Sequence, residues 1–333
     1  MSHLFILFLL IHLYLNSAER CIGLITKPDY RGEISFAYRI KSACANIGWR
    51  ADVIDFTNHE NLRKHNYDFV INLIPGGYKF PKCKNYLAIF HPIHHFFDKN
   101  GFLYKGYRSY DGYLVTHVSD NFDTKEINFT NSDQFSCMQW YPTVQKQEFH
   151  TKDPRFLFHI PCTWGDRFLD IKFKQCFQLL EEMPYMRFYG DTMFKKRYPK
   201  SYCGEISYEG NSLYKKLAQA GVVLVIHSAE HNRYGLPSGR IFEAAAVSSV
   251  IICDKNAFVQ DHFGNSVLYI DTDKSSRSIF NQIQNHMEWI RENKAEALDK
   301  AMRAHAIFED KFLLEDQLLK LEEFHNQIIN NVY

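Results

Sequence analysis

The stretch from Val222 to Asp254 combines the residue types that bind a phosphate group. Its apolar first part reads as a buried strand ending at His227, and after a polar loop Pro237-Ser238-Gly239 opens a helix near Arg240. The first backbone N–H groups of a helix have no partner within it, and its dipole is positive there, so a phosphate is stabilised at that point. Arg240 adds a permanent cation, and Glu243, one turn further, is placed to accept hydrogen bonds from a ribose diol.

Each of these residues also has a simpler interpretation. Ser238 could be an ordinary N-cap, with Arg240 on the surface and Glu243 solvated. For an isolated Ser-Gly-Arg the simpler interpretation is the more common one, so other parts of the chain must decide.

Two further candidates lie after strands of the first half. His91 follows an apolar run and begins a His-x-x-His-His cluster, and it could act as a general base or contact a sugar. A metal site at that cluster is disfavoured because no second group of ligands has suitable spacing, and a structural histidine beside Pro92 is the simplest alternative. Asp29, in the first strand–helix loop, is a candidate on the acceptor side.

Composition and missing motifs exclude several classes of protein. The chain has 333 residues, and 39 Lys+Arg against 38 Asp+Glu leave a net charge of +1, which argues against sequence-independent binding of nucleic acid. The eight cysteines include no C-x-x-C pair and are expected to be reduced and buried, so zinc ribbons and thioredoxin-type chemistry are disfavoured. Neither a G-x-G-x-x-G nor a P-loop motif occurs, which lowers the odds of nicotinamide, flavin and P-loop enzymes.

The elements that must position these residues alternate between strands and helices, and the alternation occurs twice. The expected strands cover residues 21–26, 51–56, 67–74, 87–90, 114–118, 155–160, 185–189, 222–226, 250–253 and 267–270. The polar stretch 145–154 reads as a linker between the two rounds, and residues from 275 onward are helical. This pattern predicts an α/β protein with two doubly wound parallel sheets, whose ligands bind beyond the carboxyl ends of the strands.

Four segments are therefore expected. Residues 1–18 form an apolar leader, which is a secretory signal, a membrane-seated anchor or an extension of a cytosolic enzyme. Residues 19–152 and 153–309 form the two Rossmann-like domains, and 310–333 form a helix expected to return to the first of them. A glycosylation sequon at Asn128 matters only if the chain enters a secretory lumen.

The second half resembles the donor-binding half of GT-B glycosyltransferases, of the group-1 type that is shared with spore-coat-maturation-type enzymes. The matching pieces are Gly235-Leu-Pro237, Arg240-Ile-Phe-Glu243-Ala, Val250-Ile-Ile-Cys-Asp254 and Val267-Leu-Tyr-Ile-Asp271. The resemblance covers about residues 156–325, whereas residues 20–150 match only as an α/β pattern.

The resemblance implies roles for several residues. Ser238, Gly239 and Arg240 would hold the donor diphosphate and Glu243 the ribose. Further members of the implied donor site are Gly165 and Arg167 in the loop after the strand at 155–160, Tyr208 at the nucleobase, and His227 and Glu230 after the strand at 222–226. One departure is that Gly235 stands where many members carry a first Glu, which leaves the sugar contacts and the stereochemical outcome open.

The implied activity is transfer of a hexose-type sugar from a nucleotide-diphosphate donor, UDP- or GDP-linked, to a glycan, lipid or protein acceptor. No cofactor or metal is expected, because cations and helix N-termini would stabilise the departing nucleotide. The alternatives are a sugar-nucleotide epimerase and a bilobed solute-binding protein of the periplasm or outside the cell. Nucleotide sugars favour a cytoplasmic location, with peripheral membrane contact as a further possibility, and the secretory lumen or secretion is the alternative.

Overall fold

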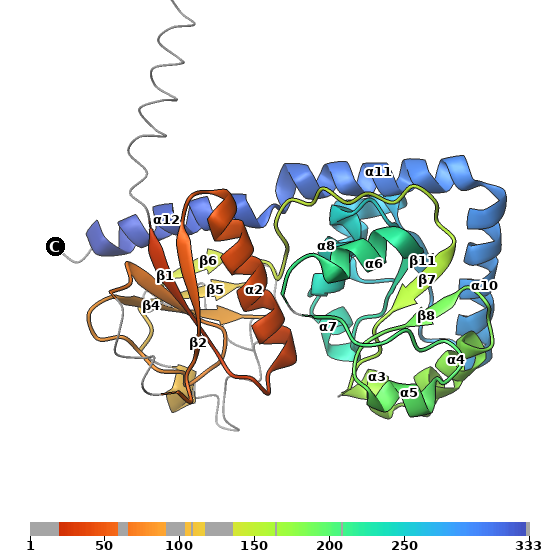
Figure 1. The fold of residues 1–333 in the computed structure, drawn as a ribbon, viewed down its shortest axis with the longest axis horizontal. Coiled ribbons are helices and arrows are strands. Elements are labelled where there is room, and N and C mark those ends of the chain that lie inside the picture. Colours follow the sequence, from red (N-terminus) through yellow and green to blue (C-terminus); the bar gives the residue numbers. More distant parts are fainter. Residues whose placement is uncertain are drawn as a thin grey trace, which may run out of the picture.

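The computed structural model describes residues 20–58, 66–90, 104–107, 109–116, 136–163, 165–207 and 209–330. Two parallel sheets with helices packed on them form an N-terminal and a C-terminal half (Figure 1). The N-terminal sheet has the order β2-β1-β3-β4-β5-β6. Its strands are β1 (Cys21–Thr26), β2 (Arg50–Asp55), β3 (Phe69–Asn72), β4 (Lys84–Ile89), β5 (Gly112–Val115) and β6 (Cys137–Gln139).

The C-terminal sheet has the order β11-β10-β9-β7-β8. Its strands are β7 (Phe156–His159), β8 (Met186–Phe188), β9 (Gly221–Val225), β10 (Val250–Asp254) and β11 (Leu268–Ile270). In each sheet the chain reverses its direction of progress once, between β1 and β3 and between β7 and β9. At such a switch point the loops diverge beyond the carboxyl ends of the strands and leave a crevice for a ligand.

The helices cover these sheets with their apolar faces. In the N-terminal half α2 (Arg31–Asn46) buries Phe36, Ala37, Ile40, Ala43 and Cys44, a spacing that follows one face of the helix. The helices of the C-terminal half are α3 (Asp166–Leu169), α4 (Ile171–Glu181), α5 (Met193–Arg197), α6 (Ser212–Ala220), α7 (Ala229–Arg233), α8 (Gly239–Ala246), α9 (Ala257–Phe263), α10 (Ser276–Glu292) and α11 (Lys294–Lys311). The short turns η3 (Lys105–Tyr107) and η4 (Gly264–Ser266) complete the described elements, with α12 (Leu314–Asn330) at the end.

The α/β class with two parallel sheets confirms the fold class predicted from the sequence. All ten expected strands are present, with ends that differ by a few residues. The edge strand β6 was not predicted, because three residues are too few to show an apolar alternation.

The polar stretch 145–154 connects the two sheets, and several of its polar side chains are buried although others are exposed. Gln145, Gln147 and Thr151 are buried. Thr151 N–H donates to the carbonyl of Val247 over 2.9 Å, and Leu314 N–H donates to the carbonyl of Val144 over 3.1 Å. Backbone groups at and just before this segment are therefore hydrogen-bonded to residues at the end of α8 and the start of α12. The polarity of the sequence does not reveal these contacts.

The last helix packs on the N-terminal half. Leu314, Leu318 and Leu321 of α12 belong to the same buried cluster as Ile22 of β1 and Phe36 of α2. Figure 1 shows α11 along the C-terminal half and α12 along the N-terminal half, so the end of the chain spans both.

The eight cysteines, all within the described part of the chain, form no disulfide. Cys44, Cys176 and Cys253 are buried, but Cys203 is exposed and the others are partly buried, so burial is less general than expected. Among the described residues no helix has the length and apolarity needed to cross a membrane.

The docking of α12 gives a direct test of its place in the N-terminal core. Leu318→Ala removes a fully buried side chain and should lower the free energy of unfolding by about 2–5 kcal/mol. Leu319→Ala, at the neighbouring position with 46% exposure, is the control and should change it by about 0.5 kcal/mol or less. Urea unfolding measures both, and equal losses would show that α12 does not pack as described.

Candidate functional site

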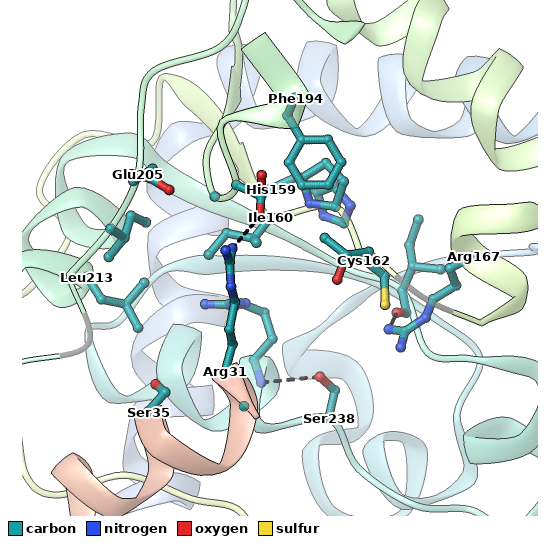
Figure 2. Close-up of a pocket in the computed structure, with 18 of the residues that line it drawn as sticks. Arg31, Ser35, His159, Ile160, Cys162, Arg167, Phe194, Glu205, Leu213 and Ser238 are labelled. Atoms are coloured by element: carbon teal, nitrogen blue, oxygen red, sulfur yellow. Dashed lines mark hydrogen bonds and ion pairs between the residues drawn. The ribbon is translucent and has the colours of Figure 1, made fainter. Parts of the chain in front are cut away.

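A cavity of about 940 Å³ lies between the two halves (Figure 2). The N-terminal half contributes the loop after β1 and the first turns of α2, with Pro28, Arg31, Gly32, Ser35 and Arg39. The C-terminal half contributes residues at and beyond the carboxyl ends of β7, β8 and β9 and the beginning of α8. Both walls therefore lie where the two switch points predict a ligand.

Three side chains of α2 face this cavity because they are spaced four residues apart. Arg31, Ser35 and Arg39 occupy successive turns of one helix face. Arg31 pairs with Asp191 of the C-terminal half at 2.5 Å, and Arg39 forms an ion pair with Glu243 of α8. Two guanidinium groups thus connect the halves across the cavity.

The opposite wall carries Arg167 and Arg240. Gly165 precedes α3 with φ 70°, a backbone conformation that glycine adopts without strain, and the turn brings Arg167 back toward β9. Nη1 of Arg167 donates to the carbonyl of Ile226 over 2.7 Å. Arg240 follows the N-cap Ser238, whose Oγ accepts from the N–H of Arg240 over 3.3 Å. Both side chains line the cavity.

Glu243 is the most constrained charged group near the cavity. Its side chain is 2% exposed and forms ion pairs with Arg240 on its own helix and with Arg39 of α2. Both partners are permanent cations, so their charges compensate for burying this carboxylate. Burial in turn lowers the pKa of Arg240, and the charge of Glu243 opposes that shift.

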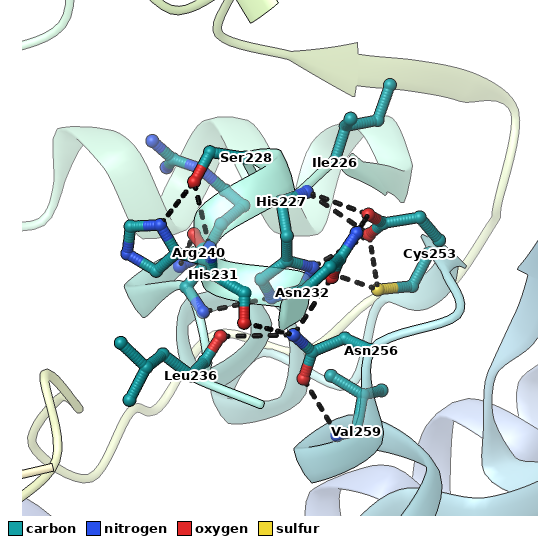
Figure 3. A network of polar contacts seen from close by, with 12 residues as sticks. Ile226, His227, Ser228, His231, Asn232, Leu236, Arg240, Cys253, Asn256 and Val259 are labelled. Carbon is teal, nitrogen blue, oxygen red and sulfur yellow. Dashed lines mark hydrogen bonds and ion pairs between the residues drawn. The ribbon is translucent and has the colours of Figure 1, made fainter. Parts of the chain in front are cut away.

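A buried polar network fixes the beginning of α8 (Figure 3). Nδ1 of His227 lies 2.7 Å from Oδ1 of Asp254, and Nε2 accepts from the backbone N–H of Ser238 over 3.0 Å. An acceptor role for Nε2 puts the ring proton of the neutral imidazole on Nδ1, which then donates to Asp254. Asp254 also accepts from Asn232 at 2.6 Å. The end of β9, the end of β10 and the start of α8 are thereby held in one arrangement.

The same network decides the protonation of Asp254. Burial raises the pKa of this carboxyl, but the hydrogen bonds from His227 and Asn232 outweigh it and hold the pKa below its ordinary value. His227, Cys253 and Asp254 lie close enough together to suggest a metal site. However, Nδ1 of His227 carries the proton bonded to Asp254 and Nε2 is occupied by Ser238, so the ring has no free lone pair for a metal.

His159, the last residue of β7, also lines the cavity. Burial lowers its pKa to about 4, and its Nδ1 lies 2.9 Å from the carbonyl of Leu224, so the ring is neutral at physiological pH. His159 is therefore a polar but uncharged group on the side of the cavity formed by the C-terminal half.

The structure brings some of the predicted residues together and separates others. Arg167, Ser238 and Arg240 line the cavity. Gly239 and Glu243 lie directly behind them, where a Cβ at Gly239 would approach the carbonyl oxygen of Pro142 to 2.9 Å.

Two predicted residues lie away from the cavity, and two lie outside the described residues. Glu230 is exposed on α7 and Asp29 is 79% exposed beside Lys27, and neither lines the cavity. His91 and Tyr208 lie outside the described residues, although residues 205–207 next to Tyr208 do line the cavity.

Sequence reasoning missed the groups that cross between the halves. Arg31, Arg39 and Asp191 were not singled out, because an arginine on a helix reads as a surface residue until its neighbour from the other half is known. His159 had a usable signal, since it ends a predicted strand at the ligand-binding edge.

No protein-family model matches the sequence, and no curated protein matches it. Solved structures do match. Sucrose-phosphate synthase from Thermosynechococcus elongatus has a TM-score of 0.57 at 11% identity, over 94% of this chain and 100% of that one. A glycosyltransferase from Rickettsia africae has 0.54 at 11% identity, over 94% and 99%. HepE from Anabaena, solved with UDP-glucose, has 0.54 at 10% identity over the same shares.

The fold is GT-B. The two Rossmann-like domains expected from the sequence match those of these structures over nearly the whole chain. The chain also matches TarM, but it spans only 54% of TarM, at a TM-score of 0.49. At such low identities the likeness concerns the fold alone.

The network below α8 predicts a defined response to acid. The folded pKa of Asp254 lies below its ordinary value of 3.8, so its contribution to stability is present above that pH and is lost as the pH falls through the folded pKa. His227→Ala removes the partner of this buried carboxylate and should lower the free energy of unfolding by about 3–5 kcal/mol. It should also move acid unfolding to higher pH.

Urea unfolding measured across a pH series tests this expectation. Arg233→Ala, an exposed change in the same loop, is the matched control and should behave like the wild type. If His227→Ala keeps the acid limb of the wild type, the network is not what holds Asp254 ionised.

Proposed function

We propose that this chain is a glycosyltransferase that moves a sugar from a nucleotide-diphosphate donor, bound in the cavity, to an acceptor held against the N-terminal half. The observation that carries the proposal is the cavity itself. Arg31, Arg39, Arg167 and Arg240 line it from both sides, and it lies at the switch points of two Rossmann-like domains. Such a concentration of guanidinium groups suits a ligand with two phosphates.

The chemistry follows from what a departing nucleotide needs. When the bond between the sugar and the diphosphate breaks, negative charge develops on the leaving oxygens, and cations placed beforehand stabilise it. Arg167 and Arg240 lie on the donor side and supply this charge together with the N-terminal end of α8. We therefore propose that the reaction needs no metal ion and no cofactor.

The contacts of Arg240 and Glu243 imply a rearrangement on donor binding. Arg240 is bonded to Glu243, so an incoming diphosphate would compete with that carboxylate for the guanidinium. A ribose diol donating to Glu243 would in turn compete with Arg39. Donor binding and the contact between the two halves are therefore coupled in this proposal, and closure around the donor would exclude water.

The finer assignment rests on similarity. HepE, which has the same fold, was solved with UDP-glucose, so UDP-sugars are the first donors to test and GDP-sugars the second. The sequence resemblance supports a hexosyltransferase of the group-1 type with a spore-coat-maturation-like donor half, acting on a glycan, lipid or protein. We also propose a cytoplasmic location, because nucleotide sugars are available there. Peripheral membrane contact is part of the same proposal.

Nucleotide binding provides the first test. UDP, GDP and ADP should be added with and without EDTA, and one of them should raise the melting temperature independently of EDTA. Arg240→Ala should abolish this shift, and Arg167→Ala should lower kcat by about 10²–10³-fold. Arg291→Ala, whose side chain is 74% exposed at the end of α10, is the control and should respond like the wild type.

Other outcomes would favour other functions. A response to a free sugar or another solute but to no nucleotide would overturn the proposal in favour of a solute-binding protein. Interconversion of two sugar nucleotides without any acceptor would identify an epimerase. A shift abolished by EDTA would refute the metal-independent part alone.

The role of Glu243 can be tested through the ribose. A hydrogen bond to a buried charged acceptor contributes about 1.5–3 kcal/mol, so the wild type should bind UDP at least about tenfold more tightly than 2′-deoxy-UDP. Glu243→Gln should lose most of this discrimination and keep much of the diphosphate affinity. Isothermal titration measures both ligands, with Glu230→Gln on the exposed face of α7 as the control. Equal discrimination in Glu243→Gln would place the ribose elsewhere.

A further inference from the structure

Two apolar side chains on the C-terminal half are unusually exposed. Leu169 is 67% exposed and Ile171 is 64% exposed, the highest values among the large apolar side chains of the described residues. They flank the junction of α3 and α4, where Asp170 caps α4 by accepting from the N–H of Lys172 over 2.7 Å. The cap turns the chain, and both side chains remain in solvent.

Helix α5 extends this apolar surface. The guanidinium of Arg197 lies 5.2 Å from the ring centre of Phe168, so α5 packs beside α3. Met193, 43% exposed, lies one turn before Arg197 on the same face of α5. Figure 1 shows α3, α5 and α4 gathered at one end of the C-terminal half.

Basic side chains lie on the same helices as these apolar groups. Lys195 and Lys196 are exposed on α5, and the ammonium of Lys174 lies 5.9 Å from the ring centre of Phe168. The acids nearby already have partners: Asp170 caps α4, and Asp191 pairs with Arg31. We call this surface the α3–α5 patch; it consists of Phe168, Leu169, Ile171, Lys174, Met193, Lys195, Lys196 and Arg197.

The patch is adjacent in sequence to residues that line the cavity. Arg167 and Phe194 line the cavity, as Figure 2 shows, and they precede Phe168 and follow Met193 directly in the sequence. A surface bound to the patch would therefore lie beside the proposed donor site.

We infer that the α3–α5 patch binds the surface of an anionic lipid bilayer. Apolar side chains that enter the boundary between headgroups and acyl chains gain by leaving water, and lysines and arginines around them are attracted to anionic headgroups. The patch offers both kinds of group on adjacent helices, whereas a neutral apolar partner would leave its cations unused. This inference does not depend on the transferase activity.

Vesicle sedimentation of the full chain tests the inference, with phosphatidylcholine vesicles that contain or lack phosphatidylserine. The apolar run Leu4 to Leu15 could bind either kind, so the preference for phosphatidylserine is the quantity to measure. The wild type should prefer phosphatidylserine, and added salt should weaken the preference. Lys195→Glu/Lys196→Glu should reduce this preference at least about tenfold.

Apolar variants test the other half of the patch. Leu169→Ser/Ile171→Ser should weaken binding to phosphatidylserine vesicles about tenfold. The controls change exposed groups elsewhere: Met302→Ser/Leu319→Ser, at 58% and 46% exposure, and Lys311→Glu/Lys320→Glu. Both controls should bind like the wild type, and all variants should keep its melting temperature.

The inference is overturned if the wild type shows no preference for phosphatidylserine. It is also overturned if the patch variants keep the full preference. Binding of an acidic protein at the patch without binding of vesicles would also refute it. Because nucleotide shifts are measured separately, a patch that binds no lipid leaves the proposed activity untouched. Conversely, a chain that binds vesicles but no nucleotide refutes the proposed function alone.

Discussion

The carboxylate of Glu243, buried between two guanidinium groups, is the interaction on which the arrangement of the site depends. A buried charge is costly unless cations and hydrogen bonds compensate for it. Here one cation, Arg240, belongs to the same helix, and the other, Arg39, belongs to the opposite half. These two ion pairs of Glu243 therefore hold α8 against α2, and α2 lines the side of the cavity opposite α8.

A network of hydrogen bonds holds the beginning of α8, and therefore the carboxylate of Glu243, in place. Asp254 at the end of β10 bonds to His227 at the end of β9, and His227 accepts the first N–H of the turn that leads into α8. Asn256 extends the network by donating to the carbonyl of Leu236 over 3.1 Å. Residues at the ends of two adjacent strands thus fix the start of α8. Because Arg240 and Glu243 lie in the first turns of this helix, the network also sets their positions.

The contact between the halves includes ion pairs at the cavity and an aromatic cluster away from it. Arg31 and Arg39 form ion pairs across the cavity, whereas Tyr141 packs among Phe242, Phe258 and Phe312, with ring centres 5.3 to 6.1 Å apart. Ion pairs can exchange partners with an anionic ligand, and packed aromatic rings cannot. The two halves can therefore respond to a ligand at the cavity and stay joined where the aromatic side chains meet.

The sequence alone determined the α/β class, the two rounds of strands and the helix start at Ser238, because apolar periodicity and capping residues act over a few positions. It also made Arg240 a candidate, since a cation at a helix start suits a phosphate, whereas Arg167 came from the resemblance to GT-B donor domains. Only the tertiary structure decided that Arg39 pairs with Glu243, that His227 binds Ser238 through Nε2, and that Thr151 is buried within a polar segment. These contacts join residues that are distant in the chain, and their energy depends on burial and on exact neighbours, which local sequence patterns do not encode.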